Sequence, residues 1–134
     1  MDILAYEYLR EGLKEYNKNL GNPRGNVVVS YPTENTTYPH TVFQEIRNVG
    51  TNLNSNFDRI GSMGYVARIY AKTKGKVDKQ TIAREIAQMV DNYMRHFKLT
   101  RISYNANESI NDNSIYEIIM TYSGNLHENR RKFI

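Results

Sequence analysis

The sequence has no cysteine and no tryptophan, and only three of its 134 residues are proline. The absence of cysteine excludes disulfides and thiolate metal sites. No apolar run approaches the roughly 20 residues needed to cross a bilayer, so we expect no membrane partner. The opening residues Met1 to Leu4 contain neither a basic segment nor a signal-type apolar block, and we therefore expect no secretion signal.

Residues suited to catalysis are few and scattered. The three histidines, His40, His96 and His127, do not share a metal-ligand spacing, and zinc without cysteine requires a cluster of histidines and carboxylates. No nucleophile elbow and no phosphate-binding glycine loop of the P-loop type is present. We therefore predict no enzymatic activity, no metal and no cofactor.

What the sequence does contain is a regular amphipathic stretch from Asp78 to Phe97, which predicts one long helix. Its apolar residues recur with a period of 3.6 residues, and Asp78 stands where an N-cap would accept the first free N–H groups. The apolar residues are Ile82, Ile86, Met89, Val90, Tyr93 and Phe97. Because the flanking segments alternate as strands do, we expect this helix to lie across a sheet.

The same patterns predict an α+β fold in a single domain, 1–134, with the order α-β-β-β-α-β-β and a mostly antiparallel sheet flanked by two helices. The predicted elements are a helix at 2–20, strands at 26–31, 41–49, 65–72, 99–104 and 114–123, the helix at 78–97, and a basic C-terminal tail at 125–134.

Three details of the strands can be checked. Alternation places Phe43, Glu45 and Arg47 on one face of the second strand. It places Ile102 and Tyr104 on the buried side of the fourth. The apolar residues of the fifth strand are expected on both of its faces, which is typical of a central strand or of one buried by another chain.

The stretch from Gly50 to Gly64 is rich in asparagine, serine and glycine, and we predict a long loop there, of the kind that is often functional. It ends in Ile60-Gly61-Ser62-Met63-Gly64, which matches the GxxG loop of a KH nucleic-acid module. The helix that should follow such a loop is missing, because Tyr65 to Lys72 alternate as a strand.

The net charge of +4 is unevenly distributed. Residues 64–104 hold nine Lys and Arg against three Asp and Glu. Two basic clusters could attract phosphate, or could be a solvated turn and a frayed tail. The candidate nucleic-acid-facing residues are Lys72, Lys74, Lys76, Arg130, Arg131 and Lys132.

Tyrosine is abundant, with eleven residues, many at predicted strand positions. Tyrosine is enriched at protein interfaces and their hot spots, although a single tyrosine is more often a core residue with an exposed hydroxyl. The set as a whole, together with the apolar fifth strand, favours assembly into an oligomer.

Taken in order, the first helix and four segments resemble phage tail terminator and tail-completion proteins, the small neck proteins of long-tailed phages. The segments are Pro39 to Asn48, Tyr65 to Ala71, Val77 to Ile86, which opens the long helix, and Ile119 to Gly124. The resemblance covers nearly the whole chain, and it implies a similar fold, a sheet with two helices.

The resemblance also implies a structural role in the virion. Such proteins form a ring, commonly a hexamer, that caps the tail tube, joins tail to head and surrounds the passing DNA. The expected partners are further copies of the chain, the tail-tube protein and the head connector. The expected location is the tail neck of the virion, and the host cytoplasm during assembly.

The interface residues expected from the long loop and the strands are Asn52, Asn54, Phe57, Arg59, Ile60, Met63, Tyr116 and Tyr122. The alternative reading is a small nucleic-acid-binding α+β module that uses the basic clusters. The resemblance separates neither a terminator from a completion protein nor a contractile from a non-contractile tail.

Overall fold

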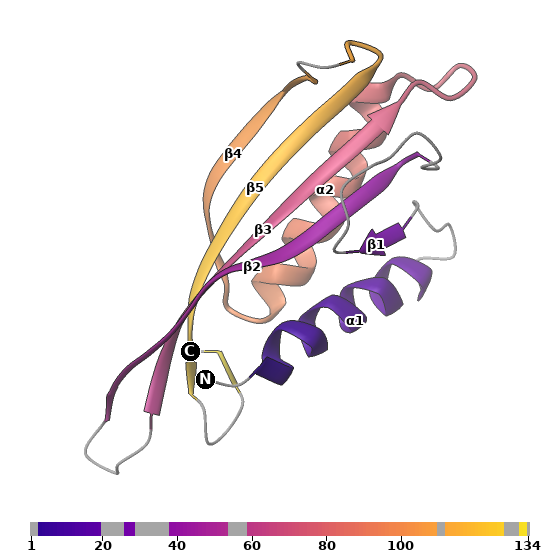
Figure 1. Ribbon diagram of the computed structural model, residues 1–134. Coiled ribbons are helices and arrows are strands. Elements are labelled where there is room, and N and C mark those ends of the chain that lie inside the picture. The colour runs from indigo at the N-terminus through magenta and orange to yellow at the C-terminus, as the bar shows by residue number, and fades with distance from the viewer. Residues whose placement is uncertain are drawn as a thin grey trace.

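The computed structural model describes residues 3–19, 26–28, 38–53, 59–109, 112–127 and 132–133. Within these ranges the chain forms two helices and one sheet, as the α+β prediction requires (Figure 1). The predicted order of elements is confirmed, and a short sixth strand follows it. The elements are α1 (Ile3–Asn19), β1 (Asn26–Val28), β2 (His40–Leu53), β3 (Arg59–Lys72), α2 (Lys79–His96), β4 (Thr100–Glu108), β5 (Ile115–His127) and β6 (Lys132–Phe133).

The strands are arranged in the order β1-β2-β3-β5-β4, and β6 pairs with β5. All pairs are antiparallel except β1 with β2, so the prediction of a mostly antiparallel sheet is confirmed. Strand β5 has a partner on both sides, as its apolar sequence indicated. Both helices lie on the same face of the sheet, α1 near β1 and β2, and α2 over β3 and β5 (Figure 1).

Helix α2 covers the sheet with the predicted stripe. Ile86, Met89 and Val90 are buried in the core, and Arg84 and Arg95 on the opposite side are exposed. The helix begins after Asp78, whose side chain accepts a hydrogen bond from the Gln80 N–H at 3.1 Å, so the predicted N-cap is confirmed. A helix of this length gains most of its stability from burying its apolar face rather than from intrinsic propensity.

Helix α1 contributes Leu9 and Leu13 to the same core, and its predicted limits at residues 2 and 20 lie just outside the described residues. The Tyr6 ring stacks on Phe43 of β2 with centroids 5.6 Å apart, and its hydroxyl donates to the Phe43 carbonyl. Burial raises the pKa of Tyr6, an effect that the neighbouring Arg10 guanidinium partly offsets. These contacts anchor the N-terminal helix to the edge of the sheet opposite β4.

The predicted loop from Gly50 to Gly64 is wrong. Residues 50–53 belong to β2 and residues 59–64 to β3, which pair with each other, and only 54–58 lie outside the described residues. The GxxG segment is therefore part of a strand with neighbours on both sides. Backbone hydrogen bonds do not depend on the side chain, so paired neighbours can hold an asparagine- and glycine-rich segment in a sheet.

A bulge in β2 changes the predicted orientation of Arg47. Glu45 lies opposite Tyr65, but the next paired residue is Arg47, opposite Gly64, so Ile46 is the extra residue. Beyond the bulge the side chains change face. Arg47 therefore lies on the face away from the helices, rather than on the face of Phe43 and Glu45.

A second bulge overturns the prediction for β4. Arg101 pairs with Tyr122 and Ser103 with Thr121, which leaves Ile102 as the extra residue. Ile102 and Tyr104 are 58% and 42% exposed, so neither is buried. The strand also continues to Glu108, beyond its predicted end at residue 104.

The remaining strand limits also differ from the predictions. Strand β5 runs to His127, beyond its predicted end at residue 123, and its buried residues share one face instead of both. Those residues are Tyr116, Ile118, Met120 and Tyr122. Strand β1 covers 26–28 of the predicted 26–31, and 29–31 lie outside the described residues. The predicted tail contributes residues 125–127 and β6 to the sheet.

Candidate interaction surfaces

Three of the sequence-predicted interface residues, Asn52, Arg59 and Ile60, lie on the far part of the β2–β3 hairpin. We call this part, residues 48–53 and 59–62, the arm. It extends past the ends of both helices (Figure 1). The backbone of all three is described but their side chains are not; Arg59 pairs with Leu53 and Ile60 with His127, whereas Asn52 lies at a register shift between Gly50 and Leu53. Asn54 and Phe57 lie outside the described residues.

Three other predicted interface residues belong to the core. Met63 and Tyr122 are fully buried, and Tyr116 is 7% exposed. All three belong to the single core cluster that joins the sheet to the helices, so their side chains are not part of the surface of this chain. The period-two alternation of Tyr116, Ile118, Met120 and Tyr122 could have identified this buried face.

The first basic cluster lies at the opposite end of the sheet from the arm. Lys72 ends β3, and Lys74 and Lys76 belong to a tight turn in which Lys74 and Val77 exchange two backbone hydrogen bonds of 3.0 Å. Gly75 has a φ of +61°, which glycine adopts at no steric cost. The three lysines are exposed, as the solvated-turn interpretation expects. The Lys72 ammonium lies 4.8 Å from the centre of the Tyr38 ring.

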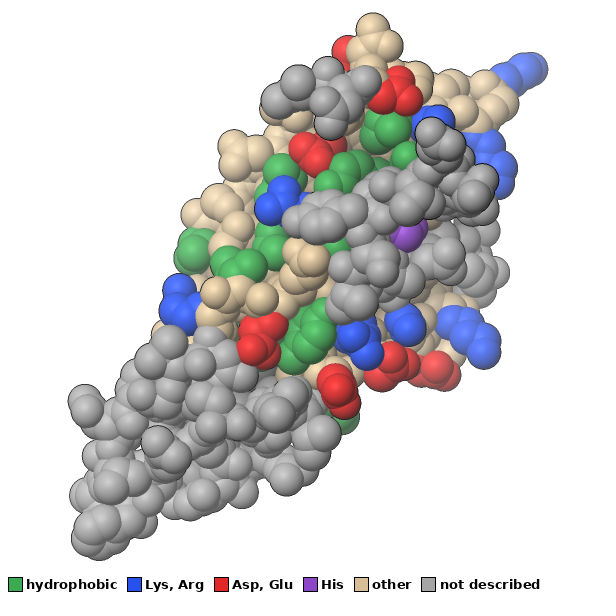
Figure 2. Space-filling view, in the orientation of Figure 1, with side chains coloured by type: hydrophobic (Ala, Val, Ile, Leu, Met, Phe, Trp, Pro, Cys, Tyr) green, Lys and Arg blue, Asp and Glu red, His purple; other side chains and the backbone are tan. Residues whose placement is uncertain are grey.

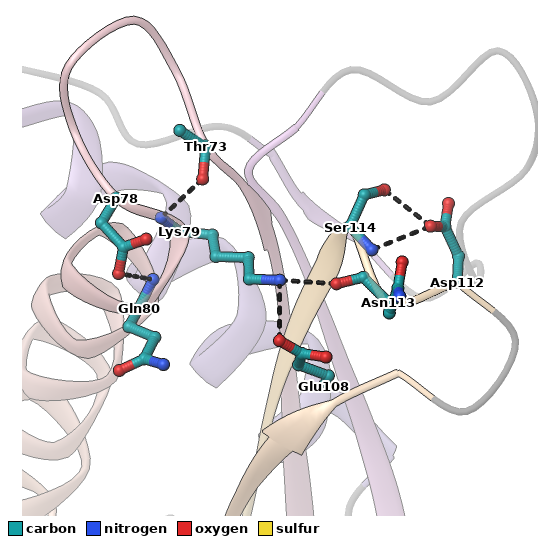
Figure 3. Close-up of polar contacts among 8 residues, drawn as sticks. All are labelled: Thr73, Asp78, Lys79, Gln80, Glu108, Asp112, Asn113 and Ser114. Atoms are coloured by element: carbon teal, nitrogen blue, oxygen red, sulfur yellow. Dashed lines mark hydrogen bonds and ion pairs between the residues drawn. The ribbon is translucent and has the colours of Figure 1, made fainter.

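Three carboxylates, those of Asp78, Glu108 and Asp112, lie near Lys79 at the base of this turn (Figure 3). The Lys79 ammonium lies 3.2 Å from a Glu108 carboxylate oxygen and donates to the Asn113 carbonyl at 2.5 Å. Asp112 accepts hydrogen bonds from the Ser114 hydroxyl and backbone N–H, which lower the pKa of its carboxyl together with the charges of Lys72 and Lys79. The positive charge at this end is therefore largely balanced.

The second basic cluster is not brought near the first. Lys132 lies in β6 opposite His127, at the arm end of β5, whereas Lys72 pairs with Ile115 at the other end. These positions are twelve residues apart along β5, which is about 40 Å along a strand. Arg130 and Arg131 lie outside the described residues. The described lysines thus do not form one continuous basic surface.

A groove between α2 and β4 was not foreseen from the sequence. It has a volume of about 230 Å³ and is lined by Arg84, Ala87, Gln88, Asp91, Arg95, Arg101 and Tyr104. The helical spacing of Arg84, Asp91 and Arg95 could have predicted that they share one face of α2. Arg101 and Tyr104 reach the groove only because β4 pairs with β5.

Asp91 organises the charges of this groove. Its carboxylate lies 3.1 Å from the Arg95 guanidinium and 3.6 Å from that of Arg101. It also accepts a hydrogen bond from the buried Tyr122 hydroxyl at 3.1 Å. Among the described residues Arg84 forms no ion pair. The lining includes three arginines and one aspartate and is therefore more basic than acidic.

The face of the sheet away from α2 carries hydrophobic side chains between charged and polar ones (Figure 2). On this face Arg47 reaches across Gly64 and donates hydrogen bonds to the hydroxyls of Ser62 at 3.0 Å and Ser123 at 2.7 Å. This arginine therefore ties β2, β3 and β5 together where the arm begins.

Two further observations concern metals and membranes. In the described part of the chain, no three histidine or carboxylate side chains gather as a metal site would require. Neither of the two described helices combines the length and apolar character of a membrane span.

Comparison with known proteins adds no family to these observations. No protein-family model matches the chain, and a search of curated proteins finds no relative.

Proposed function

We propose that this chain is a structural virion-assembly protein that caps the phage tail tube and joins tail to head as a ring, commonly a hexamer. Its partners would be further copies of itself, the tail-tube protein and the head connector, with DNA passing through the ring. It would act in the host cytoplasm during assembly and remain in the tail neck of the virion. The proposal starts from the sequence resemblance described above, whose implied fold agrees with the α+β architecture.

The structural observation that carries the proposal is the extension of the arm beyond both helices (Figure 1). The part of β2 in the arm extends for about 20 Å beyond the sheet segment that the helices cover. On this side the described core residues of β3 end at Met63, and neither helix packs on the strands beyond it. A two-stranded hairpin is at best marginally stable alone, so an arm that extends beyond the helices is suited to contact a neighbouring molecule.

Deletion of the gene from the phage or prophage tests the proposal. A terminator role predicts tails of runaway length, and a completion role predicts normal tails that do not join heads. Electron microscopy of the lysates measures both outcomes. Complementation with the unaltered gene is the control and should restore joined virions. Normal virions in the deletion lysate would rule out both roles.

The alternative, a nucleic-acid-binding module, is less well supported by the described residues. Phosphate binding requires a surface with a clear excess of positive charge, and at this end of the sheet Glu108 pairs with Lys79 and Asp112 interacts with Lys72 and Lys79 (Figure 3). A gel shift that weakens steeply with salt, and that is lost when Lys72, Lys74 and Lys76 are replaced by glutamine, would favour the alternative instead.

A further inference from the structure

Strand β4 has nine residues, and none of their side chains is buried. Eight are exposed and Ser103 is half-buried, although the strand includes apolar residues at Ile102, Tyr104 and Ala106. The reason is its position, because β4 is the last strand of the sheet and α2 mainly covers β3 and β5. Within the described residues, β4 is held mainly by its backbone pairing with β5.

The free edge of β4 has little protection against pairing with another strand. From Ser103 to Glu108 it pairs with β5 without interruption, so alternate residues direct their N–H and C=O groups outward. Residues 103–107 include no proline and no charged residue, the two features that commonly protect an edge. The bulge at Ile102 protects only the beginning of the strand.

On the opposite side of the sheet, the outer side of β2 has no strand partner beyond Val42 within the described ranges. Strand β1 covers β2 only from His40 to Val42, and from Phe43 onward β2 pairs with β3 alone among the described residues. The pairings also fix the strand directions. Strand β2 runs antiparallel to β3, β3 to β5 and β5 to β4, so β4 and β2 run in opposite directions. A second copy placed beside β4 in the same orientation would therefore offer an antiparallel partner.

The charges beside the two edges have opposite sign. At the β4 edge, the groove has three arginines, Arg84, Arg95 and Arg101, against Asp91. At the β2 edge, on the same face of the sheet, the described part of α1 and β2 carries Glu7, Glu11, Glu15 and Glu45 against Arg10, Lys14 and Lys18, an excess of one negative charge. Glu11 already lies within ion-pair distance of Arg10 and Lys14. A continuous sheet across two copies would bring α1 of one copy towards the arginine groove of the other, so the charge contact would favour this arrangement.

We propose that the β4 edge binds the β2 edge of a second copy of this chain, as a continuous antiparallel sheet from copy to copy. Such a contact joins two different surfaces, and heterologous contacts of this kind close into rings by rotation. The inference rests on the proposed ring function, for which it supplies the subunit interface. Main-chain hydrogen bonds provide the attraction, and the arginine groove favours the neighbour's acidic side.

Cysteine cross-linking tests the contact, because the natural chain has no cysteine to interfere. Asn105→Cys on β4 and Ile46→Cys on β2 both replace exposed side chains on the face away from the helices. Purified concentrated protein is treated with a bismaleimide. A mixture of the two variants should give covalent dimer, roughly tenfold more than a control mixture of Asn105→Cys with Asn92→Cys on the exposed side of α2.

The outcomes separate the possible arrangements. A chain that carries both Asn105→Cys and Ile46→Cys should form a ladder of cross-linked species. Dimer formed by Asn105→Cys alone would show that two β4 edges meet, and this would overturn the proposal. Absence of cross-linking above the control would also overturn it.

An edge-blocking variant gives an independent test. Ala106→Lys places a charge on the exposed β4 edge and should reduce the cross-linking to the control level, while circular dichroism and thermal melting stay unchanged. Asn92→Lys, which adds the same charge on α2, should cross-link normally. Phage that carry Ala106→Lys and still form normal tails would contradict this interface. The proposed ring function would then be tested by the gene-deletion experiment alone.

Discussion

The buried hydroxyl of Tyr122 donates a hydrogen bond to Oδ1 of Asp91 across 3.1 Å. This contact links the interior strand β5 to helix α2 and holds Asp91 where Arg95 and Arg101 reach it. The core and the arginine groove are therefore connected through one carboxylate. Several consequences of this contact, and of others in the core, can be measured.

Removal of the Tyr122 hydroxyl should destabilise the protein. A hydrogen bond to a charged group contributes about 1.5 kcal/mol or more, so Tyr122→Phe should lower the free energy of unfolding in urea by about that amount. Tyr104→Phe is the matched control, since that ring is exposed and should change stability little. Equal stability of Tyr122→Phe and the unaltered protein would contradict the role of the contact.

Stability should also fall in alkaline solution. Burial raises the pKa of Tyr122 above its usual value of 10.0, as does the negative charge of Asp91. Burial likewise raises the pKa of Tyr93. Because the pKa is higher in the folded protein, the tyrosine hydroxyls lose their protons first in the unfolded chain. The contribution of the buried, protonated tyrosines to the free energy of unfolding is therefore complete below pH 10 and decreases above it. Urea unfolding between pH 8 and about 11 should show a shallower decrease in Tyr122→Phe and in Tyr93→Phe.

Gly12 of α1 should resist replacement by alanine, although alanine usually stabilises helices. A Cβ atom at position 12 would overlap the Tyr93 hydroxyl, so Gly12→Ala should cost about 1–3 kcal/mol through overpacking. The Tyr93 hydroxyl is buried without a hydrogen-bond partner in the described structure. Tyr93→Phe should therefore be neutral or slightly stabilising.

The double variant of these two residues provides the check. Gly12→Ala should cost clearly less in the Tyr93→Phe background, because the clashing oxygen is gone. Thermal or urea unfolding of the four proteins gives the coupling free energy. Additive effects would show that the two residues do not meet.

Gly64 allows Arg47 to reach across β3. A Cβ atom there would lie 3.1 Å from the Arg47 Cβ, which is tighter than ordinary contact, so the arginine would have to move. Gly64→Ala should displace the guanidinium from Ser62 and Ser123 and lower the free energy of unfolding by about 1–3 kcal/mol. Ser123→Ala removes one of these hydrogen bonds and should cost less, about 1 kcal/mol. A larger loss in Ser123→Ala would contradict this explanation.

The N-cap of α2 can be tested separately. Asp78→Ala removes the acceptor of the Gln80 N–H and should cost about 1 kcal/mol, whereas Asp78→Asn keeps an acceptor oxygen and should cost a few tenths. Helix content from circular dichroism and urea midpoints measure both. Similar losses in the two variants would point to the charge of Asp78 rather than to its capping hydrogen bond.

The helices could be predicted closely because their signals are local. The apolar stripe from Ile82 to Phe97 repeats with the helical period, and Asp78 marks its start, so the predicted and observed limits of α2 differ by one residue. A helix satisfies its hydrogen bonds within its own segment, and the sequence of that segment therefore contains most of the information.

The strands depended on partners that are distant in the sequence. Residues 50–53 and 59–64 have the composition of a loop, and their pairing with each other and with β5 makes them strand. The bulges at Ile46 and Ile102 changed which side chains face the core, because one extra residue reverses the alternation beyond it. Neither bulge is marked by a glycine or a proline.

The sequence by itself determined the α+β class, the order of the elements and the apolar face of α2, since each of these follows from local periodicity. Only the tertiary structure decided that Met63, Tyr116 and Tyr122 are buried in the core. It also decided that β4 is an open edge and that Arg84, Arg95 and Arg101 share a groove. These properties arise from strand order and register, which are set by contacts between distant segments and have no local pattern.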